Sequence, residues 1–274
     1  MDDFAAFARL LDALRPWLDD LVVVGGWAHR LYRFDRLARP PAYRPLTTKD
    51  ADLAFAPNAP LTGDIGAALK AAGFDQECLG DDIPPVTEYK LGSDEQGFFA
   101  EFLTPLLGDG LRRDGSADVT VKKAGITAQK LRDLDLLLTS PWSVNVSPEV
   151  GVPVQQSVAV RIANPVSFIA QKLLIHGRRK PDKRPQDALY IHDTLELFGR
   201  ELSALRLIWQ EQVSPGVPRK TAKAIDRLRR EQFAAVTDVH RTAARIPQDR
   251  ALTPDRLQAA CAYGLDEVFG SMTI

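Results

Sequence analysis

Two aspartates, Asp50 and Asp52, stand two residues apart in RPLTTKDADLAF (residues 44–55), in front of a short apolar run. Successive side chains of a strand point to opposite faces, so residues two apart share a face. Two carboxylates on one face repel each other and lose hydration when they are buried. The spacing therefore predicts a positively charged group, such as a divalent cation, between them.

A third carboxylate, Glu101, interrupts the apolar stretch GFFAEFLTP at residues 97–105. An unpaired carboxylate in such a strand is costly to bury, so it requires a metal ion, an arginine or a bound proton. Taken alone, Glu101 is explained by a salt bridge. Taken with Asp50 and Asp52, it predicts an oxygen cage for Mg²⁺ or Mn²⁺, because Mg²⁺ is usually held by a few carboxylates with phosphate oxygens and water.

A glycine pair, Gly25-Gly26, follows the β-branched run at 22–24 in LVVVGGWAHRLYRF. The run suits a buried strand, and the glycines then turn the chain into a helix from about Trp27. Glycines let the backbone come close to a ligand, and the first N–H groups of a helix attract anions. The pair predicts either a phosphate-binding turn or simply a tight turn.

The elements that must position these residues change in kind near residue 160. Short apolar runs typical of strands alternate with amphipathic runs before it, whereas the chain from Pro165 onward is almost entirely helical. Strands are expected at 22–24, 51–55, 86–91, 98–103 and 118–122, a loop at 37–47, and helices at 3–15, 62–72, 166–177, 185–199, 200–212, 217–246 and 254–268. The pattern predicts an α+β fold, with a mixed β-sheet core flanked by helices in residues 1–160 and a mainly helical domain in residues 161–274.

The composition, 45% hydrophobic and 26% charged, is that of a soluble globular protein. No apolar run reaches the roughly 20 residues that cross a bilayer, and the two cysteines form no CxxC pair. We therefore expect a cytoplasmic protein without membrane contact. The net charge is −7 over residues 1–159 and +6 over residues 160–274. This asymmetry indicates either two solvated surfaces that attract each other, or an acidic metal-binding half beside a basic half that binds polyphosphate or RNA.

The order of glycine pair, Asp-x-Asp strand and glutamate resembles the nucleotidyltransferase superfamily typified by DNA polymerase β. The segment VVVGGWAHRLYRF…TTKDADLAF is most similar to its prokaryotic minimal and abortive-infection (AbiEii-type) toxin branches. The resemblance implies a nucleotidyltransferase core that moves a nucleoside monophosphate from an NTP, such as ATP, to an acceptor hydroxyl and releases pyrophosphate. It also implies that Asp50, Asp52 and Glu101 bind Mg²⁺ or Mn²⁺.

The same resemblance assigns nucleotide binding to the turn and to the start of the Asp-x-Asp strand. Gly25 and Gly26 would position the phosphates, and Thr48 opens the matching Thr-x-Asp-x-Asp motif. Trp27 stands where many relatives have serine or threonine. At this position either backbone N–H groups contact the nucleotide or the indole ring stacks on it.

A weaker similarity covers PVSFIAQKLLIHGRRKPDKRPQDALYIHD (residues 165–193) and points to Lys172 and Asp187, with Asp193 less firmly matched. In the AbiEii-type family the lysine helps to bind the nucleotide phosphates and the aspartate supports the site. Lys172 is otherwise explained as a surface lysine whose stem lies along apolar residues. His176 and His192 are either metal ligands or ordinary structural histidines.

The acceptor and partners are open at this stage. The resemblance suggests RNA, including a tRNA 3′ end, or a protein side chain, together with an antitoxin partner. A small molecule of the antibiotic type is an alternative acceptor. A third alternative is a non-catalytic module that binds nucleotide or RNA at a degenerate site.

Overall fold

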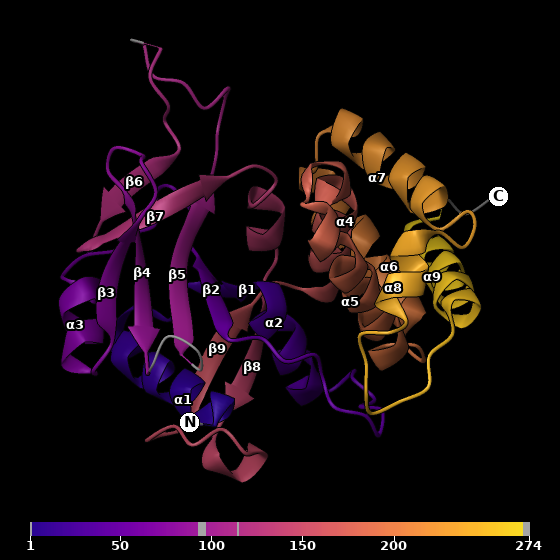
Figure 1. The fold of residues 1–274 in the computed structure, drawn as a ribbon, viewed down its shortest axis with the longest axis horizontal. Helices are drawn as coiled ribbons and strands as arrows, with labels where there is room; N and C mark the ends of the chain where they lie inside the picture. Colours follow the sequence, from indigo (N-terminus) through magenta and orange to yellow (C-terminus); the bar gives the residue numbers. More distant parts are fainter. Residues whose placement is uncertain (1, 93–96, 114, 271–274) are drawn as a thin grey trace. The chain divides into compact units, whose positions relative to one another are not determined.

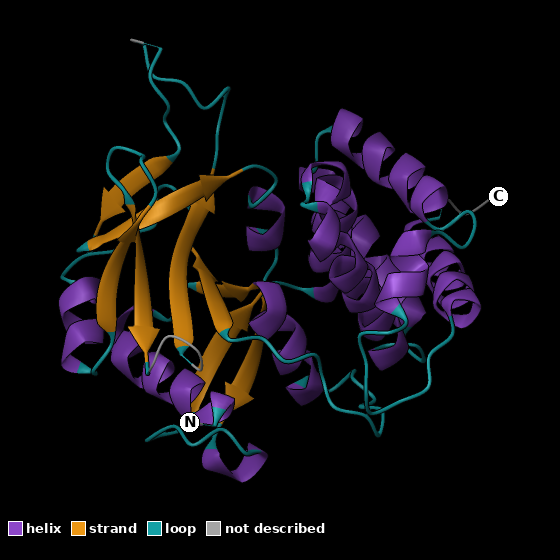
Figure 2. Ribbon diagram, in the orientation of Figure 1, coloured by secondary structure: helices purple, strands orange, loops and turns teal. Residues whose placement is uncertain are grey.

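The computed structural model describes residues 2–92, 97–113 and 115–270. The chain forms two compact units, the first made of Met1–Phe34 and Thr47–Ala163 and the second of Asp35–Leu46 and Asn164–Ile274. Strands occur in the first unit, and the described part of the second is helical (Figure 2). The predicted α+β class is confirmed.

The first unit is built on one mixed sheet, to which nine strands of the described residues belong. The strands are β1 (Val22–Val24), β2 (Asp50–Ala54), β3 (Asp75–Leu79), β4 (Val86–Leu91), β5 (Phe98–Pro105), β6 (Thr120–Lys123), β7 (Ile126–Leu131), β8 (Trp142–Val146) and β9 (Val158–Ile162). Their order is β3-β4-β5-β2-β1-β9-β8, with β7 pairing with β5 and β6 pairing with β7. The expected strands are all present, but β3, β7, β8 and β9 were not expected.

Three helices contact strands of this sheet (Figure 1). They are α1 (Asp3–Leu14), α2 (Gly25–Leu31) and α3 (Ile65–Ala71). The unit also has single-turn 3₁₀ helices at Arg15–Trp17, Tyr32–Phe34, Asp135–Leu138 and Pro148–Val150. The apolar side of α1, including Phe7 and Leu11, is fully buried, and α1 contacts both α3 and β5. In β2, β4 and β5 the residues of one parity, such as Leu53, Tyr89 and Phe102, are buried in this core, so residues of the other parity lie on the opposite face.

The second unit is a cluster of helices around α5. Its elements are α4 (Pro165–Ile175), η5 (His176–Arg178), η6 (Pro181–Lys183), α5 (Arg184–Leu197), α6 (Leu202–Ile208), the π-helical turn η7 (Trp209–Val213), η8 (Ser214–Gly216), α7 (Arg219–Gln232), α8 (Asp238–Ala243) and α9 (Pro254–Phe269). Helix α5 contacts α4, α8 and α9, and nearly all of its side chains are buried. Such all-round burial explains why α5 has little amphipathic character.

The prediction of one continuous helix at 217–246 is wrong, because the structure has two helices there. Helix α7 ends at Gln232, and α8 begins at Asp238 after a break that contains Phe233 and Thr237. Thr237 caps α8. Its side chain accepts a hydrogen bond from the His240 backbone N–H, and the His240 ring accepts one from the Thr237 backbone N–H. A capping residue inside the run thus starts a new helix. No helix in the described ranges is both long and apolar enough to cross a membrane.

Residues 35–46, expected as a loop, belong to the second unit. The backbone N–H of Arg39 donates to the Leu197 carbonyl (2.8 Å), and that of Arg44 donates to the Asp249 carboxylate (2.8 Å). Between them, the Tyr43 hydroxyl donates to the Glu196 carboxylate. These bonds tie an irregular segment to α5 and to the chain before α9.

Candidate active site

The register of three strands brings the predicted carboxylates onto one face of the sheet. Strand β2 pairs with β5 in parallel, so Asp52 lies opposite Glu101, and Asp50 lies opposite Phe99. On its other side β2 pairs with β1, where Val24 lies opposite Asp52. Because directly opposite residues share a face, Asp50, Asp52 and Glu101 are on the same face, the one turned away from the buried Leu53.

The glycine turn meets this face at Asp52. Gly25 follows directly on Val24 and has a φ of +61°, in the left-handed region that glycine adopts without strain. A Cβ placed on Gly25 would overlap the Oδ2 atom of Asp52. A residue without a side chain is therefore required for two reasons, the backbone angle and the space that the carboxylate fills.

Glu101 has an unusual environment for a carboxyl group. Burial, a hydrogen bond with Glu88, and the charges of Asp52, Glu88 and Asp50 together raise the pKa of Glu101 to about 8. Glu88 lies opposite Glu101 because β4 pairs with β5 in antiparallel register. Sequence reasoning missed Glu88, although it stands in an expected strand with the buried Thr87 and Tyr89 on either side.

Thr48 and Arg30 support the start of β2. The Thr48 hydroxyl accepts a hydrogen bond from the Asp50 N–H (3.3 Å), and the Thr48 carbonyl accepts one from the Arg30 guanidinium (3.4 Å). Arg30 also pairs with Asp3 (3.1 Å) and lies over the Trp27 ring, with 7% of its surface exposed. Thr48 thus holds the backbone at the start of β2, and its contact with a nucleotide stays a prediction.

The Trp27 ring is fully buried. It stacks on Phe7 with 4.0 Å between ring centroids and 8° between ring planes, and it meets the edge of Phe98. The ring therefore belongs to the core against which α2 packs. It has no exposed surface that could stack on a nucleotide. Only its backbone remains available for the predicted nucleotide contact.

Lys172 and Asp187, expected at the nucleotide, are paired with each other inside the second unit. The Lys172 ammonium is 2.6 Å from Asp187 Oδ1, and Arg179 donates to Asp187 Oδ2 (3.1 Å). Both members are buried, with 6% and 1% exposed. Lys172 is thus no surface lysine. With His176, Gln232 and other residues, the pair lines a cavity of about 390 Å³.

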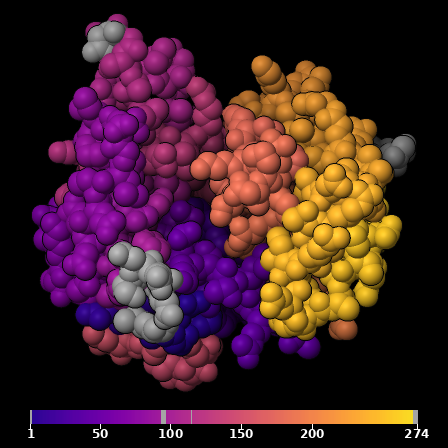
Figure 3. Space-filling model, viewed as in Figure 1, coloured from indigo at the N-terminus to yellow at the C-terminus, as the bar shows by residue number. Residues whose placement is uncertain are grey.

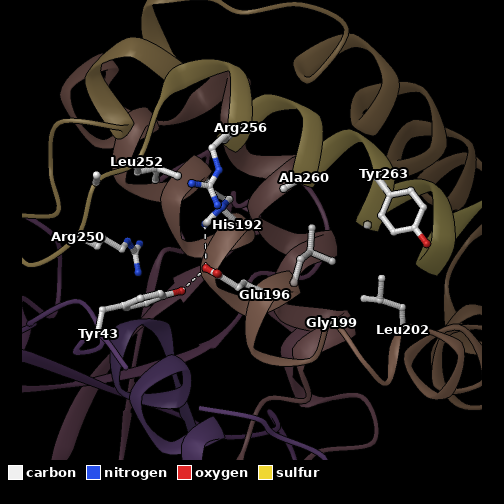
Figure 4. Close-up of a pocket in the computed structure, with 13 residues that line it drawn as sticks. Tyr43, His192, Glu196, Gly199, Leu202, Arg250, Leu252, Arg256, Ala260 and Tyr263 are labelled. Atoms are coloured by element: carbon white, nitrogen blue, oxygen red, sulfur yellow. Dashed lines mark hydrogen bonds and ion pairs between the residues drawn. The ribbon is translucent and has the colours of Figure 1, made fainter. Parts of the chain in front are cut away.

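A separate cluster of side chains in the second unit has ligand atoms close enough together to bind one metal ion. His192, Asp193 and Glu196 offer ligand atoms within 4.8 Å of one another, the only such group of three that the described residues form. His192 and Glu196 of this group line a cavity of about 340 Å³, and Figure 4 shows Tyr43 with its hydroxyl toward Glu196 and Arg250 beside it. Arg250 pairs with Asp193 (2.5 Å) and stacks on Tyr43, so a cation is already present in the protein itself.

Comparison with known protein families decides the class of the chain. The model of a family described as nucleotidyltransferase matches residues 2–214. The chain belongs to this nucleotidyltransferase family. The match covers the first unit and the second as far as η8, so Asp50, Asp52, Glu101, Lys172 and Asp187 all lie inside it. No curated protein gives a significant match to this nucleotidyltransferase.

The acidic face of the nucleotidyltransferase suits a hard divalent cation. All its donors are carboxylate oxygens, the type that Mg²⁺ and Mn²⁺ prefer, and Gly25 leaves the backbone close to Asp52. The carboxylate oxygens of the three residues do not all lie within 4.8 Å of one another; the residues are Asp50, Asp52 and Glu101. Like charges on one face repel, and a bound cation would supply the attraction that draws them together.

Proposed function

We propose that this nucleotidyltransferase moves a nucleoside monophosphate from an NTP to an acceptor hydroxyl and releases pyrophosphate, with Mg²⁺ or Mn²⁺ as cofactor. The observation that carries the proposal is the contact of the Gly25 turn with Asp52. It joins a backbone able to approach phosphates to a face that bears Asp50 and Glu101 as well. Membership of the family supports the transfer in general.

Each residue has a defined part in the proposal. The divalent cation, when bound, would neutralise the phosphate charge and lower the pKa of the attacking hydroxyl. Asp50 and Asp52 hold it, and the Gly25-Gly26 backbone accommodates the phosphates. Glu101 holds the cation as well, and as a carboxylate beside the acceptor it can help to take the proton of the acceptor hydroxyl. Thr48 fixes the backbone of Asp50.

Lys172 and Asp187 enter the proposal as a phosphate-binding pair. Asp187 orients the Lys172 ammonium, and both border the same cavity, which supports a role in ligand binding. In this assignment Lys172 neutralises charge on the leaving pyrophosphate. A lysine is suited to this because its ammonium is a compact positive charge.

For the acceptor we propose RNA, including a tRNA 3′ end, in line with a toxin of the AbiEii type that has an antitoxin partner in the cytoplasm. Exposed basic side chains in the second unit support an RNA acceptor. They lie between α4 and α5 and on α7, which is drawn in orange at the upper right of Figure 3, and comprise Arg178, Arg179, Lys180, Arg219, Lys220, Lys223, Arg227 and Arg230. The free cysteines, Cys78 and Cys261, agree with a reducing compartment.

Incubation of the whole protein with each α-labelled NTP, total RNA and Mg²⁺ tests the proposal. We expect label to pass to RNA with at least one NTP, and EDTA or Asp52→Asn to abolish the transfer. Asp52→Asn removes one of several like charges, so its melting temperature should equal that of the wild type or exceed it. Full activity of Asp52→Asn would end the proposal, whereas metal-dependent transfer to a small hydroxyl compound instead of RNA would overturn only the acceptor.

A further inference from the structure

A cavity inside the second unit is enclosed by four of its helices. It has a volume of about 390 Å³ and is lined by residues of α4, α5, α7 and α8 and of the turns beside them. Ligand cavities in proteins usually have volumes of about 300–1,000 Å³ and largely apolar walls with a few polar groups that select the ligand. The apolar part of this wall consists of Ala188, Ile191, Leu228, Phe233 and Val239.

His240 contributes a hydrogen-bond donor to this cavity. The backbone N–H of Thr237 donates to His240 Nδ1 (3.0 Å), so the proton of the neutral ring is on Nε2. Burial lowers the pKa of His240, and the charge of His176 lowers it further, so the ring is neutral at pH 7 and above. His240 is 1% exposed, yet no residue in the described part of the chain bonds Nε2. A buried donor without a partner is costly, so this N–H points to a bound molecule.

Lys172 supplies a positive charge to the same cavity. An ammonium group has three N–H donors, and Asp187 accepts one of them at 2.6 Å. The rings of Phe168 and Tyr190 lie beside the ammonium, with their centroids 5.4 and 5.2 Å from Nζ. Among the residues that the structure describes, no second acceptor bonds the group. The buried Lys172 ammonium can therefore donate to a further acceptor inside the cavity.

The charges around the cavity favour an anion. Lys172 and Arg179 share the carboxylate of Asp187, so one negative charge faces two positive ones. Glu231 also lines the cavity, but its carboxylate pairs with Arg227 (2.9 Å). A phosphate group suits these surroundings, because its oxygens carry negative charge and accept hydrogen bonds from ammonium and N–H groups.

We propose that this cavity is a nucleotide site, in which phosphate oxygens accept hydrogen bonds from His240 Nε2–H and the Lys172 ammonium while the nucleoside lies on the apolar wall. The inference rests on the proposed function, which supplies an NTP and assigns Lys172 to its phosphates. It adds His240 as a binding residue, beyond residues 2–214, the range that the family model matches. Gly177 and Thr237 in the cavity wall are exposed, so a ligand can enter from solvent.

Isothermal titration calorimetry of the whole protein with each of the four NTPs and with pyrophosphate, all in EDTA, tests this. Without a divalent cation the acidic face of the first unit repels phosphates, so binding reports on the cavity. We expect at least one NTP to bind, and to bind more tightly than pyrophosphate, which has no nucleoside for the apolar wall. His240→Met should weaken NTP binding about tenfold or more, since a hydrogen bond to a charged group is lost. His240→Gln should weaken it less, because glutamine keeps an N–H donor and is a usual capping residue at this position.

Lys223→Met is the matched control for Lys172→Met. Both changes remove one lysine charge from the second unit, but Lys223 is exposed on α7 and does not line the cavity. Lys172→Met should abolish measurable NTP binding, and Lys223→Met should bind within about twofold of the wild type. Thermal unfolding of each variant checks the fold. Should His240→Met or Lys172→Met fail to fold, Leu228→Trp decides, because it fills the cavity and leaves both donors in place; wild-type affinity in Leu228→Trp would contradict the proposal.

The outcomes separate this inference from the proposed function. Wild-type NTP affinity in His240→Met would overturn the role of His240, and no NTP binding in EDTA would overturn the nucleotide site in the cavity. Both results leave the proposed function to the label-transfer assay. Pyrophosphate bound more tightly than every NTP would overturn the place of the nucleoside. NTP binding that depends on His240, in a protein that transfers label to no acceptor, would support the cavity site and overturn the proposed function.

Discussion

The Cα atom of Gly25 lies against the carboxylate of Asp52, so closely that any side chain at position 25 would occupy the place of Asp52 Oδ2. The contact follows from the antiparallel register of Val24 with Asp52, since Gly25 directly follows the last residue of β1 and begins α2. One backbone turn and one acidic side chain are thereby fixed as a unit.

Gly25→Ala should reduce both stability and nucleotidyl transfer. The left-handed backbone alone costs an alanine about 1–2 kcal/mol, and the clash with Asp52 adds to that and displaces the carboxylate. Gly80→Ala is a suitable control because Gly80 has a φ of +79° with no atom within 4 Å of its Cβ position. Urea unfolding and transfer assays should show a larger loss for Gly25→Ala; equal losses would contradict the role of the Asp52 contact.

Glu101→Gln should change how stability depends on pH. The pKa of Glu101 is raised from 4.5 to about 8 by burial, by Glu88 and by neighbouring charges, so the folded state binds its proton more tightly than the unfolded state does. The stability contributed by the protonated group is present below pH 4.5 and is lost as the pH rises to about 8. The variant should lack this loss.

Urea unfolding in EDTA at about pH 5 and about pH 9 measures the effect. The advantage of Glu101→Gln over the wild type should grow between the two values, and Mg²⁺ should reduce it at the higher pH. Glu211→Gln, at an exposed glutamate of η7, serves as control. A constant difference between Glu101→Gln and wild type across the range would refute the prediction.

Asp187→Asn should destabilise the protein by roughly 3–5 kcal/mol, because it leaves the buried Lys172 ammonium without its carboxylate. Replacing both members, as in Lys172→Met with Asp187→Leu, should cost less than Asp187→Asn alone. For comparison, Glu231→Gln breaks the exposed Arg227–Glu231 pair on α7 and should cost no more than about 0.5 kcal/mol. Equal effects of Asp187→Asn and Glu231→Gln in urea unfolding would show that burial does not matter here.

Arg250→Met should lower the melting temperature, because Asp193, which is 3% exposed, loses the cation 2.5 Å away. The same change should let Zn²⁺ bind at His192, Asp193 and Glu196, whose ligand atoms are close enough to share an ion. Zn²⁺ should therefore raise the melting temperature of Arg250→Met and leave the wild type unaffected. Adding His192→Ala to the variant should remove the response; stabilisation that persists would place the ion elsewhere.

The sequence was sufficient for the strand that carries Asp50 and Asp52, since alternation alone puts both on one face. It was also sufficient for the fold class, because strand-like runs end where the long helical patterns begin. It could not give the order of strands in the sheet, and Glu88 was therefore missed. Its importance arises only when β4 pairs with β5 in the register that sets it against Glu101.

Burial of charged side chains was equally hard to foresee. Arginine side chains are mostly exposed, yet the Arg30 guanidinium is covered by the rings of Phe4 and Trp27. Lys172 and Asp187 are 15 residues apart and meet only because α4 and α5 pack together. Such pairings depend on tertiary contacts, which hydrophobic periodicity along the chain does not encode.

The chain passes from one unit to the other three times, after Phe34, after Leu46 and after Ala163. A single cut near residue 160 therefore does not yield two self-sufficient pieces. The fragment 1–160 would carry residues 35–46 without Leu197 and Asp249, the acceptors of their hydrogen bonds. Cleavage there should instead leave a nicked protein whose halves co-purify, with the Tyr43 segment acting as a noncovalent tether.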